Sequence, residues 1–370
     1  MEFLPEPFRT GLAFVVVLGV LVFIHELGHY VAARLMRVHV DVFSIGFGRA
    51  IASWTARTGT VWKLAWIPLG GYVKLHGQEQ PAEASPEDRA RWRAGETFHE
   101  KSVGARAFIV AAGPIANFLL AAVLFAGLYG TMGRPTTTAV VGEVVADSAA
   151  DRAGMQAGDR ILDVDGIAVA RFEDVQRAIS SRPGATVTIT VERDHAPRAL
   201  TATIEARTLP DGSQSGILGV RGGQASFERL GPVSAVAAGI GQTWNVSTQT
   251  LAGVWQMITG ARGTEELGGP LRIAQLSGQV AELGLGALIT FMAVLSVNLA
   301  LINLFPIPVL DGGHLLFYAA EALRGRPLSP KAQEFGFRAG FALLIALFVF
   351  ATFNDLSSLG VVRWVAGLVG

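Results

Sequence analysis

The sequence predicts a polytopic α-helical membrane protein of about four transmembrane helices, with an inserted small α+β domain and a membrane-associated β-hairpin loop. Its 370 residues are 51% apolar and only 16% charged, against roughly 25% charged residues in a typical soluble domain. The apolar residues gather in four long stretches, and a polar segment with strand-like alternation lies between the second and the third. These three observations together indicate the fold class.

Each of the four apolar stretches approaches the roughly 20 residues that a helix needs to cross a bilayer. They are residues 11–24, continuing in pattern to about 33, and residues 107–130, 284–305 and 336–353. A signal peptide is the alternative for the first stretch. It fits poorly, because Glu2 and Glu6 precede the stretch and no small-residue cleavage site closes it. A further apolar segment from Val361 is too short to span and contains Arg363.

The overall composition excludes several classes of protein. The 30 basic and 30 acidic side chains give a net charge of zero, which argues against a nucleic-acid-binding protein. The high apolar content excludes a disordered chain. The chain has no cysteine, so a disulfide framework or a thiolate metal site is impossible. Any metal ion must therefore be held by His, Asp or Glu.

Basic residues in the loops predict the orientation in the membrane. The short loop between the third and fourth stretches contains Arg324, Arg326 and Lys331. Residues 34–106 contain eleven more basic residues: Arg34, Arg37, Arg49, Arg57, Lys63, Lys74, Arg89, Arg91, Arg93, Lys101 and Arg106. We therefore expect both loops to be cytoplasmic. Both termini and residues 131–283 would then lie on the periplasmic side of a bacterial inner membrane.

A small domain is predicted at the start of the long periplasmic segment. Residues 138–207 contain short strand-like runs separated by glycine-rich turns, at Val140–Val141, Ile161–Leu162, Val187–Val191 and Leu200–Ile204. Residues 172–180 predict one helix, because their apolar side chains recur at helical spacing.

Residues 233–260 predict an amphipathic helix with two tryptophans on its apolar face. Trp244 and Trp255 share that face with Ile240, Leu251 and Ile258. Such a helix is typical of a membrane interface. The alternative is a helix that packs on a protein core.

The sequence His25-Glu26-Leu27-Gly28-His29 fits the pattern H-E-x-x-H. On a helix, residues i and i+4 lie one above the other, so His25 and His29 can share a zinc ion while Glu26 activates a bound water. Each ionisable side chain in a membrane helix costs about 2.5–3.5 kcal/mol, which favours a function for all three. The alternative is a hydrogen-bonded polar patch between helices.

Zinc needs a third protein ligand, and Asp311 is the candidate. It follows residues 303–310, where Pro306 and Pro308 break the helix at the end of the third stretch. Irregular backbone at membrane depth is tolerated where it lines a cavity. The alternatives are that Asp311 only caps the next helix, or that His314 is the ligand.

These residues resemble the site-2 protease family of intramembrane zinc metalloproteases, in particular its bacterial RseP branch, which cleaves anti-sigma factors. The resemblance covers nearly the whole chain. It rests on residues 25–29 and 303–313, and also on residues 43–48, 68–74, 113–117 and 268–270.

The resemblance implies one zinc ion per chain, held by His25, His29 and Asp311, with Glu26 as the catalytic base. It implies that Asn298 and Asn303 hold the substrate or polarise its carbonyl; the alternative for either is a helix–helix hydrogen bond. It also implies that the strand at residues 66–75, including Gly70, Gly71, Tyr72 and Val73, pairs with an extended substrate. The alternative is an ordinary hairpin.

Residues 154–166 give the inserted segment a resemblance to circularly permuted bacterial PDZ domains. Such a domain binds an extended peptide at a sheet edge, here expected to be a peptide C-terminus at the strand Val141, Gly142, Glu143 and Val144. One PDZ domain is predicted where many RseP-like proteins have two. The predicted organisation is residues 1–134, a membrane core; 135–208, the PDZ domain; 209–283, a linker with interfacial helices; and 284–370, a second membrane core.

The predicted function is cleavage of a transmembrane segment of single-pass membrane proteins, an anti-sigma factor or signal-peptide remnants. About 21 Å of helix separates residue 11 from residue 25, which places the site in the cytoplasmic third of the bilayer. An inactive PDZ adaptor is one alternative, but it would lack a ligand or base. A metal transporter is the other, but it would need polar residues on several spans.

Overall fold

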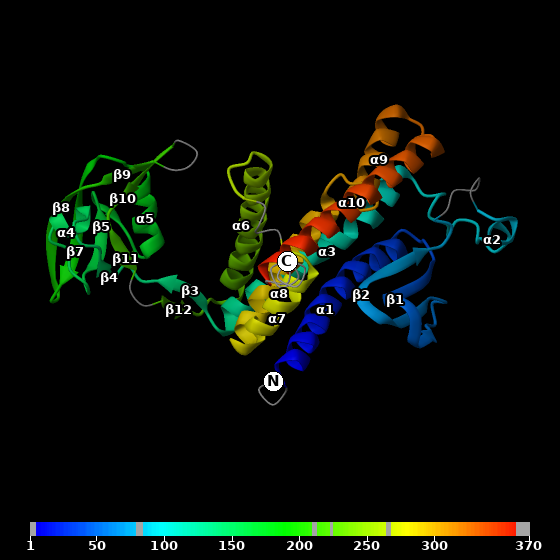
Figure 1. Cartoon of the computed structure of the whole chain (residues 1–370), viewed down its shortest axis with the longest axis horizontal. Helices are drawn as coiled ribbons and strands as arrows, with labels where there is room; N and C mark the ends of the chain where they lie inside the picture. Colours follow the sequence, from blue (N-terminus) through cyan, green and yellow to red (C-terminus); the bar gives the residue numbers. More distant parts are fainter. Residues whose placement is uncertain (1–4, 79–83, 209–212, 223–224, 264–267, 360–370) are drawn as a thin grey trace, which may run out of the picture. The chain divides into compact units, whose positions relative to one another are not determined.

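The computed structural model describes residues 5–78, 84–208, 213–222, 225–263 and 268–359 (Figure 1). Within these residues, four helices are long and apolar enough to cross a membrane: α1 (Glu6–Leu35), α3 (Val103–Thr131), α8 (Leu285–Leu304) and α10 (Pro330–Ser358). They contain the four predicted stretches, apart from residues 284 and 305, so the polytopic helical fold class is confirmed. The described residues divide into two compact units. One comprises residues up to 127, 236–257 and from 263; the other comprises residues 128–235 and 258–262.

The membrane unit also contains a long antiparallel pair of strands, β1 (Val40–Thr55) and β2 (Val61–Leu75). The start of β2 pairs with both ends of β1, and the end of β2 returns to pair with residues 40–45. At the bend, Gly70 has a φ of +123°, and a Cβ atom there would lie 3.1 Å from Cζ of Phe47. The segment Gly71–Leu75 therefore lies at an edge of the sheet. Among the described residues, only β1 pairs with it along this segment.

The helices α1 and α3 cross closely because both have small residues at the crossing. A Cβ atom at Gly28 would lie 2.8 Å from Cβ of Ala116, and one at Gly113 would lie 2.6 Å from Cε1 of His29. Glycine at both positions lets the two backbones approach, as small residues do in membrane helix pairs. This crossing brings the histidines of α1 against α3.

Among the described residues, the membrane unit contains four more helices. They are α2 (Pro86–Ala90), α6 (Pro232–Ile258, which begins in the other unit), α7 (Pro270–Glu282) and α9 (Asp311–Arg324). The N-terminus of α7 is capped by a buried carboxylate from α10, because Asp355 accepts hydrogen bonds from the N–H groups of Gly269 at 2.8 Å and Arg272 at 3.1 Å. These two hydrogen bonds fix the start of α7.

The predicted amphipathic helix is present as α6. Its apolar stripe is exposed: Trp244 is 69% and Trp255 65% exposed. Thr243 and Ser247 on the other side are buried. Near its start, a Cβ atom at Gly239 would lie 2.8 Å from the backbone N of Ala126 in α3. An exposed apolar stripe of this kind suits contact with lipid.

The second unit is an α+β domain with a core of buried aliphatic side chains that includes Val141, Ile161, Val164, Val187, Ile189 and Val191. Its main sheet has the order β6–β5–β7–β8 and is antiparallel. These strands are β5 (Arg160–Val164), β6 (Ile167–Ala168), β7 (Thr186–Arg193) and β8 (Ala196–Thr203). The helices are α4 (Ala149–Arg152) and α5 (Phe172–Ser180). The helix α5 has the predicted bounds.

Three strand pairs complete this domain. In each, a strand late in the segment pairs with an earlier one: β12 (Ala225–Glu228) with β3 (Arg134–Thr137), β11 (Val220–Gly222) with β4 (Val141–Val144), and β10 (Gln214–Ile217) with β9 (Glu205–Thr208). Leu218 also belongs to the core. The domain is therefore longer than the predicted range of residues 135–208, and its C-terminal part is not a linker.

The predicted peptide groove at Val141–Val144 is partly occupied by pairing within the domain. Both backbone groups of Val141 are hydrogen-bonded to the loop before β5, its N–H to the carbonyl of Asp159 at 2.8 Å and its carbonyl to the N–H of Gly158 at 2.7 Å. The other edge of β4 pairs with β11. The backbone groups of Val141 are therefore not free to pair with an added peptide strand.

Candidate metal centre

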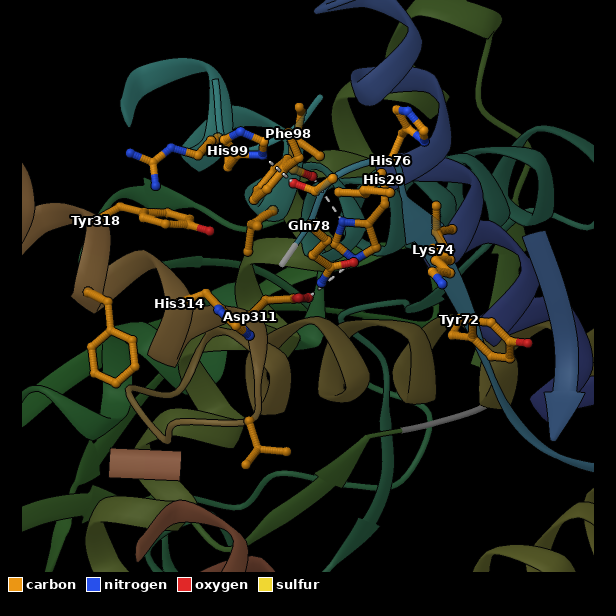
Figure 2. A pocket seen from close by; sticks show the side chains of 18 of the residues that line it. His29, Tyr72, Lys74, His76, Gln78, Phe98, His99, Asp311, His314 and Tyr318 are labelled. Atoms are coloured by element: carbon orange, nitrogen blue, oxygen red, sulfur yellow. Dashed lines mark hydrogen bonds and ion pairs between the residues drawn. The ribbon is translucent and has the colours of Figure 1, made fainter. Parts of the chain in front are cut away.

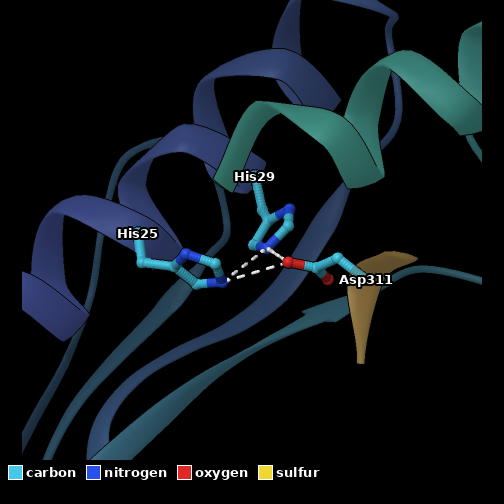
Figure 3. A group of neighbouring side chains, drawn as sticks. All are labelled: His25, His29 and Asp311. Atoms are coloured by element: carbon cyan, nitrogen blue, oxygen red, sulfur yellow. Dashed lines mark hydrogen bonds and ion pairs between the residues drawn. The ribbon is translucent and has the colours of Figure 1, made fainter. Parts of the chain in front are cut away.

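Three predicted metal ligands come together from two helices (Figure 3). Nε2 of His25 lies 3.3 Å from Nε2 of His29, and Oδ2 of Asp311 lies 3.2 Å from the first and 3.5 Å from the second. The side chains are 11%, 13% and 18% exposed. The three ligand atoms therefore face a common point inside the protein.

The spacing of these three atoms fits zinc. At Zn–N distances of 2.0–2.1 Å and Zn–O distances of 2.0–2.2 Å, the corners of a tetrahedron lie about 3.3–3.5 Å apart. The three observed distances of 3.2, 3.3 and 3.5 Å agree with this. Oδ2 of Asp311 is buried and has no hydrogen-bond donor among the described residues. A cation would satisfy that oxygen and relieve the crowding of lone pairs.

The helix α3 contacts both histidines from behind. Nδ1 of His29 lies 2.9 Å from the carbonyl oxygen of Ile109, and Nδ1 of His25 lies 3.3 Å from the side-chain amide of Asn117. Gly113 lies between these two contacts and leaves room for both rings. The Nδ1 atoms are thus engaged by α3, and the Nε2 atoms are left for the cluster.

Asp311 reaches the cluster because the chain turns sharply after α8. Val309 has a φ of +98°, a strained backbone conformation for a branched residue. Gly340 of α10 packs on this turn, since a Cβ atom there would lie 2.8 Å from the carbonyl carbon of Pro308. The turn thus brings a carboxylate to the two histidines, and the ionised carboxylate is the form of this side chain that binds metal.

Glu26 lies between the cluster and the sheet. Its carboxylate has a backbone hydrogen bond with Val73, and a Cβ atom at Gly71 would lie 3.2 Å from its Cγ. A general base beside a metal-ligand pair and next to a strand edge can act on a peptide bond held at that edge.

A cavity of about 950 Å³ opens over the cluster (Figure 2). Residues 71–78, including Tyr72 and Lys74, line one wall of the cavity. His314 and Tyr318 of α9 line another. Burial raises the pKa of Tyr318 to about 12. Arg106 forms an ion pair with Glu321 at 2.6 Å and lies 5.0 Å from the ring of Tyr318. The cavity is large enough for a stretch of extended peptide.

The other predicted site residues differ in position. Asn303 lines the cavity, where its Nδ2 donates to the carbonyl of Leu299 at 3.0 Å. Asn298 does not line it; its Oδ1 accepts a 3.0 Å hydrogen bond from the hydroxyl of Thr250 in α6. His314 lines the cavity but lies outside the ligand cluster, with its ring 5.3 Å from that of Phe337.

Two contributors to the centre were not predicted from sequence. Asn117 is buried at 0% exposure in the apolar helix α3, and its polarity there was the available signal. The carbonyl of Ile109 has no signal of its own, because every residue has a carbonyl.

Fold and site together define a class of protein: a polytopic membrane protein with a metal centre of the H-E-x-x-H type. Residues 13–347 match the sequence profile of peptidase family M50, and the chain belongs to this family. It is a site-2-type zinc metalloprotease, which confirms the resemblance seen in the sequence.

Relatives match over nearly the whole chain. A Rhizobium meliloti (strain 1021) protein named as a candidate zinc metalloprotease is 44% identical over 361 residues, covering 93% of this chain and 95% of its own length. Metalloprotease MmpA of Caulobacter vibrioides is 37% identical, with coverages of 95% and 96%. The regulator of sigma-E protease RseP of Salmonella typhimurium is 33% identical, with coverages of 94% and 98%. These similarities and the four spans identify a multi-pass inner-membrane protein.

Among solved structures, the PDZ domain of an SdrC-like protein from Listeria monocytogenes is similar to part of the chain. It is 23% identical, covers 23% of this chain and 87% of its own, and has a TM-score of 0.21.

Proposed function

We propose that this chain is an intramembrane zinc endopeptidase that cleaves the transmembrane segment of single-pass membrane proteins, with an anti-sigma factor or signal-peptide remnants as substrates. The observation that carries this proposal is the cluster of His25, His29 and Asp311, whose ligand atoms have the spacing of a tetrahedral zinc site. The cluster is built on a candidate membrane span, so its substrate must be reached within the bilayer.

The donor set fits one zinc ion per chain. His25 and His29 would hold it through Nε2 and Asp311 through Oδ2, which leaves a fourth position for water. When bound, zinc lowers the pKa of that water and polarises the scissile carbonyl.

Glu26 is the proposed general base. Its carboxylate accepts the proton of the attacking water and then delivers it to the leaving nitrogen of the peptide. The backbone hydrogen bond with Val73 holds this carboxylate beside the strand edge. Asn303 lines the same cavity and is proposed to donate to a substrate carbonyl.

The edge segment Gly71–Leu75 is the proposed substrate platform. A helical substrate hides its peptide groups in its own hydrogen bonds, so it must become extended before cleavage. An extended segment can add to this edge, because only β1 pairs with it among the described residues. The exposed side chain of Tyr72 and the bend at Gly70 shape this platform.

Asn298 has a different proposed role. Its hydrogen bond with Thr250 ties α8 to α6, which favours the helix–helix alternative over direct contact with substrate.

The proposed topology places both termini and the PDZ domain on the periplasmic side and the catalytic site near the cytoplasmic side. The basic loops support this orientation. The PDZ domain, extended to include residues 214–222, is proposed to bind a peptide C-terminus, at an edge other than β4.

A cleavage assay in liposomes tests this function. The full-length chain is reconstituted with zinc and a single-pass model substrate, and the products are identified by mass spectrometry. We expect one cut inside the apolar segment, in its cytoplasmic third, and none with His25→Ala. The matched control is His195→Ala, in the turn between β7 and β8, which should cleave normally. A cut outside the apolar segment, or cleavage by His25→Ala, would contradict the proposal.

A further inference from the structure

Asn117 has an unusual environment for an amide side chain. It is fully buried in α3, and its amide lies 3.3 Å from Nδ1 of His25. Its Oδ1 has no hydrogen-bond partner among the residues that the structure describes. A buried acceptor without a donor costs about 1–3 kcal/mol, so it requires an explanation.

The tautomer of His25 supplies one. Nε2 of His25 faces His29 and Asp311, so this nitrogen must keep its lone pair free to bind a metal. A neutral imidazole carries one N–H, which is then on Nδ1 and needs an acceptor. The neighbouring amide has both an oxygen and an NH2 group, and the two exchange places by a half-turn. With that half-turn, the oxygen accepts the proton of Nδ1 and is no longer without a partner.

We propose that Asn117 is a positioning residue of the metal centre: its amide oxygen accepts the Nδ1–H of His25 and fixes the tautomer that presents Nε2 to zinc. This inference rests on the proposed function of the His25, His29 and Asp311 cluster. Asn117 acts through His25 and does not contact the metal or the substrate.

The contact of α3 with His29 has the same form. Nδ1 of His29 lies 2.9 Å from the carbonyl oxygen of Ile109, which can only accept, so this nitrogen must carry the proton. Asn117 lies eight positions further along the same helix, and Gly113 between them clears the space for both rings. The helix α3 thus provides an oxygen acceptor for the Nδ1–H group of each imidazole.

The backbone of Asn117 is itself held in place. The hydroxyl of Ser296 in α8 is buried and donates a 2.8 Å hydrogen bond to the carbonyl of Asn117. This bond ties α8, which leads into the Asp311 turn, to the residue behind His25. Partners that orient metal-bound histidines typically contribute 10- to 100-fold to metal affinity.

Zinc affinity of the full-length chain in detergent micelles is the test, measured by competition with a chelator of known affinity. Asn117→Leu keeps the volume but has no acceptor, and we expect zinc affinity 10- to 100-fold weaker. Asn117→Asp keeps an acceptor and has no donor, and should bind within about threefold of wild type. Asn117→Ala repeats the loss if the leucine variant does not fold.

Two controls separate positioning from packing. Thermal unfolding of the metal-free chain should be similar for wild type, Asn117→Leu and Asn117→Ala. The lost hydrogen bond selects the tautomer of His25 that binds metal, and its loss should therefore affect zinc affinity. Ser296→Ala removes the backbone bond and leaves the amide in place, so its zinc affinity should change by less than that of Asn117→Leu. Equal zinc affinity of wild type, Leu and Ala variants would overturn the proposal. A zinc affinity of Asn117→Asp as weak as that of Asn117→Leu would also overturn it, because the amide would then act as a donor.

The same measurement distinguishes failure of this inference from failure of the proposed function. Absence of zinc binding by wild type, or full binding by His25→Ala, would remove the metal centre and this inference with it. Loss of zinc in His25→Ala together with unchanged zinc in Asn117→Leu and Asn117→Ala would overturn the role of Asn117 alone.

Discussion

Gly113 of α3 lies directly against the imidazole of His29. A Cβ atom at position 113 would lie 2.6 Å from Cε1 of His29 and 2.9 Å from Cε1 of His25, and its closest contact would be Nε2 of His29. All three contacts are shorter than any that side chains normally make. The metal centre therefore depends on the absence of a side chain on the neighbouring helix as much as on its ligands.

Gly113→Ala should weaken zinc binding by at least about tenfold, because the added methyl group must push an imidazole away from the cluster. The measurement is chelator competition on the full-length chain. Gly127→Ala is the matched control on the same helix, since a Cβ atom there would meet nothing within 4 Å. Equal zinc affinity of the two variants would show that the rings do not occupy the described positions.

Asp311→Asn should lose zinc while keeping the shape of the turn. The amide has no negative charge and would place a donor or a weaker acceptor where the carboxylate oxygen lies 3.2 Å from Nε2 of His25. We expect zinc retention after gel filtration to fall to background. His314→Gln tests the rival ligand and should keep zinc, because His314 lies outside the cluster. The reverse pattern would make His314 the ligand.

Removal of the metal should also abolish activity reversibly. A strong chelator is expected to stop cleavage of the model substrate, and added zinc should restore it. Magnesium should not restore it, because two imidazoles are poor ligands for that ion. Full activity after verified removal of the metal would contradict a metal-dependent mechanism.

The ion pair of Asp159 and Arg193 should make the α+β domain sensitive to acid. Burial disfavours ionisation of Asp159, but hydrogen bonds from Arg193 at 2.6 and 2.7 Å and from the N–H of Gln156 lower its pKa. The lowered pKa lies below the unfolded value of about 3.9. The pair therefore stabilises the domain fully above about pH 4, and this contribution is lost as the pH falls through the lowered pKa.

Asp159→Asn should destabilise the domain by about 2 kcal/mol at pH 7, and the difference from wild type should shrink below about pH 4. Hydrogen exchange of residues 160–193 in the full-length chain measures this. Glu143→Gln removes the exposed pair with Arg221 and should cost less than about 1 kcal/mol. A pH-independent difference for Asp159→Asn would refute the ionic origin.

The capping bond from α10 gives a prediction for α7. Asp355→Ala leaves the N–H groups of Gly269 and Arg272 without their acceptor, which should cost about 2 kcal/mol. Amide hydrogens of residues 270–282 should then exchange faster. Ser329→Ala removes an exposed cap at the start of α10 and should leave α7 unchanged. Unchanged exchange in α7 after Asp355→Ala would show that the cap is not needed.

Local patterns predicted the parts of the centre that lie on one helix. The spacing of His25 and His29 places both rings on one face of α1, so their meeting follows from helix geometry alone. Asp311 is far away in sequence, and its choice depended on the helix break before it. The strained turn at Val309 and the packing of Gly340 on Pro308 explain how it reaches the cluster. No local pattern contains that information.

Long-range pairing explains where the sequence was misleading. The sequence predicts a linker from residue 209, yet β11 pairs with β4 and Leu218 joins the core. The edge that was predicted to be open at Val141 is closed by the same kind of pairing. The partner of Asn298 was equally hidden, because the face that α8 turns toward Thr250 depends on tertiary packing.

Glu26 is proposed to act as the general base beside a zinc ion held by this chain. The decisive measurement compares wild type and Glu26→Gln for zinc content and for cleavage of a single-pass substrate in the same liposome preparation. Glutamine keeps the size of the side chain and removes the proton acceptor. We predict full zinc content and no cleavage by Glu26→Gln. Cleavage at the wild-type rate with zinc retained would show that Glu26 is not the base.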